Sequence, residues 1–117
     1  MTKALKQLSV DERRVAARYE FAAFAWYKRI DDAAEASEEG VARSCDISET
    51  GVGIVTARAL PVGAKVFLKI IAAGASVSAI ARVMHCRALE NGNFRLGLEV
   101  FCVPPTDRQV WKYLCGG

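Results

Sequence analysis

The sequence predicts a mainly β domain, arranged as a small antiparallel barrel or sandwich. Much of the chain after residue 40 consists of short segments in which apolar and polar residues alternate, as in strands that bury one face. Turn-forming residues separate these segments, among them Pro61-Val-Gly63 and the hairpin signal Asn91-Gly92-Asn93. Short strands at regular spacing are typical of barrels and sandwiches. The 117 residues are enough for one such domain but not for two.

The first element, between residues 10 and 37, has two interpretations. Ser9 and Glu12 have the spacing of a capping box, and the alanine, arginine and glutamate that follow favour a long helix. Period-two alternation instead indicates a strand near residues 19–29, with Glu20 and Lys28 on the opposite face from the apolar residues. Those apolar residues are Tyr19, Phe21, Ala23, Ala25 and Tyr27. Helical spacing fits almost as well, so the residues alone leave both interpretations open.

The later elements follow in order. Strands are expected at residues 40–45, 51–57, 65–73, 77–89 and 94–103. After Pro104-Pro105, Thr106 is expected to cap a short helix that carries Val110, Trp111 and Leu114. The aromatic residues are expected to pack in the core or at the barrel ends, and Arg82, Arg87 and Arg95 to point outward.

Charge is distributed unevenly along a chain whose net charge is only +3. Residues 1–30 carry seven Lys/Arg and three acids, residues 31–50 one and seven, and residues 51–117 eight and three. This pattern suits a compact anionic ligand better than a nucleic-acid polymer, which needs a continuous basic stripe. The alternative is that the basic and acidic stretches neutralise each other across the barrel.

Cysteine usage and hydropathy predict a cytoplasmic protein. The four cysteines form no CxxC pair, and with a single histidine there is no spacing for a metal site. No apolar run has the length of a membrane span, and no secretory signal is visible. We therefore expect reduced thiols, no cofactor and no membrane insertion.

Two short motifs carry the functional information. Arg14 and Arg18 form an RxxxR motif, and Asp46, Ser48 and Gly51 form a DxSxxG motif that is separated from the first by 27 residues. Arginine holds phosphate or the O6/N7 edge of guanine, whereas a carboxylate accepts from the opposite guanine edge and Ser supplies an adaptable hydroxyl. Gly lets the backbone turn and a flat ligand approach. Taken alone, the first motif is also typical of a solvated helix face and the second of a tight turn.

The combination resembles the PilZ domain family. The resemblance rests on the two motifs with Glu12-Arg13 before the first, and on Gly53-Ile54, Leu60-Pro61-Val-Gly63 and Arg95-Leu-Gly-Leu-Glu-Val-Phe101. It implies a six-stranded antiparallel β-barrel over residues 12–103, an N-terminal extension at 1–11 and a C-terminal helix within 104–117 that packs on the barrel. It also favours a flexible arm at 12–18, followed by a strand near 19–29.

The resemblance implies a receptor for cyclic di-GMP, a bacterial second messenger with two phosphates and two guanines. The expected contacts are Arg13, Arg14, Arg18, Asp46, Ser48 and Gly51, and an arginine at position 13 is associated in the family with an intercalated pair of ligand molecules. Binding would change the conformation of the arm and signal through an unidentified protein partner.

Three other functions are alternatives for a chain of this kind. An adaptor of the same fold for motility or pilus machinery, without nucleotide, usually lacks one or both motifs. A barrel for single-stranded nucleic acid interleaves aromatic and basic residues on exposed strands, which the sequence is not expected to do. An enzyme is not expected, because no nucleophile–base pair is visible.

Overall fold

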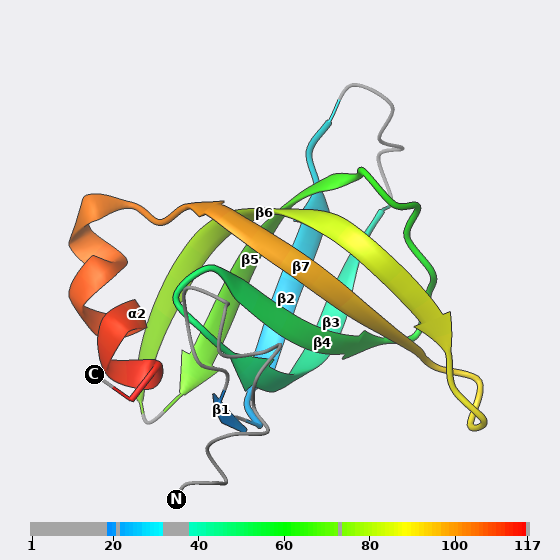
Figure 1. Ribbon diagram of the computed structural model, residues 1–117, viewed down its shortest axis with the longest axis horizontal. Helices are drawn as coiled ribbons and strands as arrows, with labels where there is room; N and C mark the ends of the chain where they lie inside the picture. The colour runs from blue at the N-terminus through cyan, green and yellow to red at the C-terminus, as the bar shows by residue number, and fades with distance from the viewer. Residues whose placement is uncertain (1–18, 21, 32–37, 73, 117) are drawn as a thin grey trace, which may run out of the picture.

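The computed structural model describes residues 19–20, 22–31, 38–72 and 74–116 of the chain. Seven strands and one α-helix lie in these residues (Figure 1). They are β1 Tyr19–Glu20, β2 Phe24–Arg29, β3 Glu39–Ile47, β4 Gly51–Thr56, β5 Lys65–Ala72, β6 Ala75–Ala88, β7 Phe94–Cys102, the 3-10 helix η1 Pro105–Asp107 and α2 Arg108–Leu114.

The strands form one closed antiparallel barrel. Their order is β1-β3-β2-β5-β6-β7-β4, and an additional pairing of β3 with β4 closes the ring. The six long strands make up the barrel wall, and the two-residue β1 is added beside β3. α2 lies outside the barrel, beside one end (Figure 1). The expected six-stranded barrel with a C-terminal helix is therefore confirmed.

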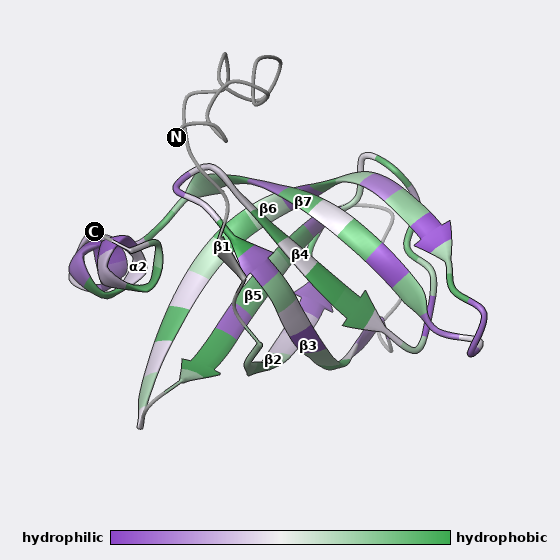
Figure 2. Cartoon of the chain, turned by 60° about the horizontal axis from the view of Figure 1, so that its bottom comes forward, coloured by the Kyte–Doolittle hydropathy of each residue, from purple (hydrophilic) through white to green (hydrophobic). Residues whose placement is uncertain are grey.

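Alternation along the strands fills the barrel interior. On β5, Val66, Leu68 and Ile70 are fully buried, whereas Lys65 and Lys69 are not. The same period of two gives the banded colouring of the strands in Figure 2. On β2, Ala25 and Tyr27 point inward as the strand interpretation expected. A strand at 24–29 excludes the long helix there, because its residues pair with both β3 and β5.

The C-terminal segment differs from expectation at its start. Thr106 lies inside η1 and provides no cap, and α2 begins after Asp107 without a side-chain cap. The Asp107 carboxylate instead accepts the backbone N–H of Ser78 on β6 at 2.8 Å, which ties the helix start to the barrel. The expected Thr106 cap was wrong, because the N-cap of α2 is Asp107, one residue further along the chain, and Asp107 is the residue that this tertiary hydrogen bond holds. No helix of the described residues is long and apolar enough to cross a membrane.

Candidate functional site

A one-residue bulge turns Asp46 to the outside of the barrel. Ser44 pairs with Ile54 and Asp46 pairs with Gly53, so Cys45 is the extra residue of β3. Ser44 and Ile47 are both fully buried although they are three residues apart, which a regular strand does not allow. Without the bulge, Asp46 would point into the apolar interior. Bulges of this kind re-aim a side chain and are frequent next to functional sites.

A second bulge, on β6, has the same effect on His85. Val83 pairs with Leu98 and His85 pairs with Gly97, so Met84 is the extra residue. The His85 ring lies over Gly97 so closely that a Cβ at that position would overlap it. The sole histidine of the chain therefore lies flat across β7 on the outer face, and only glycine at position 97 leaves room for it.

Asp46 and His85 flank a pair of glycines, Gly53 and Gly97, which face each other across β4 and β7 and which we call the glycine floor. Asp46, Gly53, Gly97 and His85 thus form one row across four adjacent strands. A Cβ at Gly53 would come within 2.9 Å of Asp46 Oδ1 and 3.2 Å of Arg95 Nη2. In the glycine floor, the side chains of Asp46, Arg95 and His85 therefore lie directly against glycine backbone that carries no Cβ.

An ion pair lies across this floor. Arg95 Nη2 on β7 donates to Asp46 Oδ2 at 2.6 Å, a short charge-assisted hydrogen bond. The side chains are partly exposed, 33% for Arg95 and 19% for Asp46. The pair therefore fixes the direction of the Asp46 carboxylate while leaving it within reach of solvent and of a ligand.

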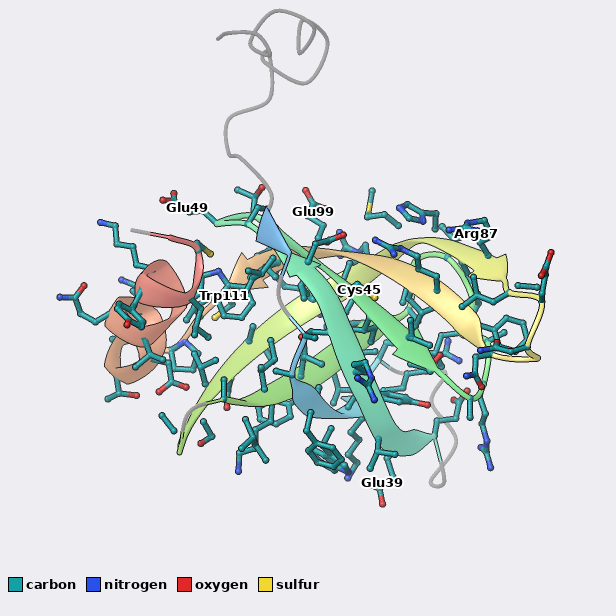
Figure 3. All side chains as sticks on the ribbon, turned by 90° about the horizontal axis from the view of Figure 1, so that it is seen from below. Glu39, Cys45, Glu49, Arg87, Glu99 and Trp111 are labelled. Carbon is teal, nitrogen blue, oxygen red and sulfur yellow. The ribbon has the colours of Figure 1, made fainter. Side chains whose placement is uncertain are left out.

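The next row of outward residues, beside the glycine floor, is rich in arginine. Arg43, Val55, Arg95 and Arg87 are neighbours across β3, β4, β7 and β6. Arg87 stands directly opposite Arg95, and Figure 3 shows it projecting from the same side of the barrel as Glu99. Among the described residues Arg87 forms no ion pair, and like charges placed opposite each other are unfavourable without an anion. This row can attract a phosphate.

The turn between β3 and β4 holds the remaining motif residues. The Ser48 side chain is buried. Its hydroxyl donates a hydrogen bond to the Gly51 carbonyl and accepts one from the Thr50 N–H, each with a donor–acceptor distance of 3.3 Å. The Ser48 carbonyl accepts the indole N–H of buried Trp111 at 3.1 Å, so α2 is fastened to this turn (Figure 3). Positive φ in the described residues occurs at Gly63, Gly74, Gly92 and Gly116, so Gly51 needs no left-handed backbone. The DxSxxG motif therefore forms a tight turn, which is the structural role that the sequence allowed for it.

The end of α2 lies close to the same turn. Cys115 is buried there, and burial together with the negative charge of Glu49 raises the pKa of its thiol to about 11. Glu49 is the residue after Ser48 in the turn. The thiol is therefore protonated at neutral pH and acts as an apolar packing group.

The arginines of the first motif lie outside the described residues. Arg13, Arg14 and Arg18 belong to the undescribed segment 1–18. The strand that follows them is described: Tyr19 pairs with Ile47 and Glu20 with Asp46. The described residues that follow the arginine motif in the sequence therefore lie beside the Asp46 motif. Asp46, Ser48 and Gly51 are brought together by one bulged strand end and its turn.

Sequence reasoning missed the contributions of His85 and the Asp46–Arg95 pair. The sequence signal that could have indicated them is a shift in the alternation of inward and outward residues along β3 and β6. Inward residues three apart, Ser44 with Ile47 and Val83 with Cys86, mark the two bulges on either side of the glycine floor. The described residues hold no cluster of His, Cys, Asp or Glu that could bind a metal ion.

The comparison with protein families identifies the class of protein. The PilZ domain model matches residues 12–115, nearly the whole chain, and the chain belongs to the PilZ domain family. This family commonly binds cyclic di-GMP and acts as a non-catalytic receptor. No curated protein sequence matches this chain.

Solved structures of similar fold agree with this assignment. The Bacillus subtilis inhibitor of motility (MotI/DgrA) superposes with a TM-score of 0.69 at 19% identity, over 88% of this chain and 49% of that chain. The PilZ domain of YcgR from Escherichia coli, solved with c-di-GMP, gives 0.67 at 17% identity and 89% coverage of both chains. The complex of MrkH from K. pneumonia with c-di-GMP gives 0.62 at 18% identity, over 89% of this chain and 51% of that chain. This chain thus spans about half the length of the first and third.

Proposed function

We propose that this chain is a receptor for cyclic di-GMP that binds the ligand between Arg13, Arg14 and Arg18 and the Asp46 face of the barrel. The observation that carries the proposal is the glycine floor with its two bulges, which turn Asp46 and His85 outward over bare backbone. Two solved relatives of the fold contain this ligand. The pairing of β1 with Asp46 and Ile47 supports closeness of the two motifs.

Each group on the barrel has a role that fits the ligand. The Asp46 carboxylate, oriented by Arg95, accepts hydrogen bonds from the N1–H and N2–H groups of guanine. Gly53 and Gly97 let the Asp46–Arg95 pair and the His85 ring lie close to the wall, and a flat base rests on these side chains. Arg87 offers its guanidinium to a phosphate, which relieves its repulsion from Arg95. Ser48 and Gly51 keep the turn in shape, because the Ser48 hydroxyl and carbonyl are engaged inside the protein.

Binding orders the arm against the barrel in this proposal. The contacts between arm arginines and ligand phosphates exist only in the closed state, so the ligand shifts the chain toward that state. The surface formed by the arm is then read by a protein partner. The free thiols of Cys45, Cys86, Cys102 and Cys115 are consistent with action in a reducing cytoplasm.

Arginine substitutions test the proposal. Arg14→Ala and Arg18→Ala each remove a phosphate or guanine contact, and charge-assisted hydrogen bonds contribute about 1.5–3 kcal/mol each. Affinity for cyclic di-GMP, measured by calorimetry, is expected to fall by roughly tenfold or more in each variant. Arg58→Ala, an exposed arginine after β4, is the matched control and keeps wild-type affinity. The melting temperature of all three stays near that of the wild type, and undiminished affinity of both motif variants would remove the assignment.

The ligand ratio tests the role of Arg13. A pair of ligand molecules brings four phosphates, and a third arginine helps to neutralise them. We expect two molecules per chain for the wild type and one for Arg13→Ala. A ratio that is the same in both proteins contradicts this role but leaves the receptor assignment in place.

A further inference from the structure

The outer face of β2 and β5 carries an apolar surface that the nucleotide site does not use. We define the β2–β5 face by its outward apolar residues, which come from four adjacent strands: Phe24, Trp26, Val41, Phe67, Ile71 and Ile80. Phe24, Val41 and Ile71 are 54%, 60% and 43% exposed. Phe24 was expected to pack in the core or at a barrel end but is largely exposed, and the same holds for Phe101, which is 48% exposed.

The β2–β5 face lies across the barrel from the glycine floor. In the closed ring of six strands, β2 and β5 stand opposite β7 and β4. Figure 3 shows Glu39, at the edge of this face, projecting on the side away from Arg87 and Glu99. The centre of the β2–β5 face and the glycine floor therefore lie on different sides of the barrel, and the two surfaces adjoin at Arg43 and Val55 of the arginine row.

Cations are interleaved with the apolar residues. Lys69 pairs with Trp26 and Lys28 pairs with Phe67, so each lysine stands beside an aromatic ring on the neighbouring strand. Lys65 and Arg82 both lie over the Phe101 ring, at 5.8 and 5.3 Å from its centroid. The sequence was expected to lack such interleaving on exposed strands, and that expectation was wrong because it depends on which residues point outward.

Negative charge is nearly absent from this face. Apart from Asp46, which belongs to the glycine floor, Glu39 is the one acid at the outward positions of β2, β3 and β5 in the described residues. No ion pair there involves Lys28, Lys65, Lys69 or Arg43 within the described part of the chain. Although Lys28 stands opposite Glu39, the described residues of this face carry more cations than acids around an apolar centre, which is complementary to carboxylates around apolar side chains.

A cleft adjoins the face at Phe24 and Val41. Its volume is 490 Å³, its walls are mostly apolar, and Arg43 is its one charged lining residue. The other lining residues are Ala22, Ala23, Ala42, Val55, Thr56, Ala57 and Asn93. A cleft of this kind takes an apolar anchor side chain, and such anchors supply most of the binding energy of an interface.

We propose that the β2–β5 face and this cleft dock a protein partner whose contact surface has an apolar centre ringed by Asp or Glu. The partner inserts an apolar anchor beside Phe24 and Val41 and places carboxylates on Lys28 and Lys69. This inference goes beyond the nucleotide receptor and does not depend on it.

Other occupants fit the face less well. Single-stranded nucleic acid stacks on open rings, whereas Trp26 and Phe67 pack edge to face with centroids 5.9 Å apart, and the rest of the centre is aliphatic. A second copy of the chain in a symmetric dimer would bring this cationic face against itself.

Site-specific photocrosslinking tests the proposal in the cells that make the protein. The full chain carries p-benzoylphenylalanine at position 24 or 71, or at position 62 on the β4–β5 turn as a control. We expect a protein adduct from positions 24 and 71, with Asp or Glu beside apolar residues in the crosslinked peptide. A double variant, Lys28→Glu with Lys69→Glu, is expected to lower the adduct yield at least fivefold. Lys112→Glu on α2 is the matched charge-reversal control and leaves the yield unchanged.

Charge exchange completes the test. The purified partner, with the carboxylates of the crosslinked peptide changed to lysine, is expected to regain affinity for the double variant and to lose it for the wild type. Cyclic di-GMP affinity of the double variant stays at the wild-type value, so failure here is distinct from failure of the nucleotide site. Adducts with nucleic acid, lipid or a second copy, the absence of any adduct, or an adduct that survives charge reversal would each overturn the proposal.

Discussion

At the scale of single residues, glycine decides what the outer face of the barrel can hold. Gly53 leaves room for the Asp46–Arg95 pair, and Gly97 leaves room for the His85 ring. Neither glycine needs a left-handed backbone, so their value lies in the missing Cβ. This differs from the turn glycines Gly63, Gly74 and Gly92, whose φ values are near 90°.

Gly97→Ala tests the contact with His85. The new methyl group overlaps the imidazole, which must swing off β7, and we expect unfolding free energy to fall by about 1 kcal/mol. In a His85→Ala background the methyl group has space, and the penalty is expected to vanish, because alanine is otherwise better than glycine in a strand. Denaturant unfolding of the four proteins measures this as a double-mutant cycle. An equal penalty in both backgrounds contradicts the described packing.

Residue-scale features were the hardest to predict from sequence. The chemistry of Asp46 was visible in its motif, but its outward direction depends on the bulge at Cys45. In the sequence the bulge appears only as two inward residues three apart, Ser44 and Ile47, a spacing that regular period-two alternation does not produce. Phe24 and Trp26 were expected in the core or at the barrel ends, whereas the pairing of β2 with β3 and β5 points them outward.

At the scale of elements, α2 and the β3–β4 turn form one packed unit. The Trp111 indole donates to the Ser48 carbonyl, and Cys115 is buried near Glu49. The strands themselves were largely predictable. Alternation and turn residues placed the ends of β3 to β7 within two residues of where the structure has them. The start of α2 was not, because the bond from Ser78 to Asp107 is tertiary.

The titration of Cys115 tests the packing of α2. Its folded-state pKa of about 11 is above the ordinary value of 9.0, so the unfolded chain ionises first as pH rises. Stability from this group is complete below pH 9 and is lost between about pH 9 and 11. We expect the wild type to lose more stability over that interval than Cys115→Ala. Burial also raises the pKa of Tyr27, whose contribution is common to both proteins and cancels in the comparison. Identical pH profiles would show that the thiol is not buried by α2.

At the scale of the whole molecule, the barrel separates two surfaces. The glycine floor with its arginine row lies on β3, β4, β7 and β6, and the β2–β5 face lies on the other side. The barrel class was predictable because the number of strands and the spacing of the turns follow from local sequence patterns. The separation of the two faces was not, since it follows from the closed strand order.

The central claim is that the chain binds cyclic di-GMP, and the most direct measurement is calorimetric titration of the full chain. Cyclic di-AMP and GTP serve as controls for the base and for phosphate alone. We expect micromolar or tighter binding of cyclic di-GMP, at least tenfold weaker affinity for both controls, and a clear stabilisation of the fold by the ligand. Absence of heat and of stabilisation at saturating ligand would contradict it, and the Asp46 motif would then be a structural turn.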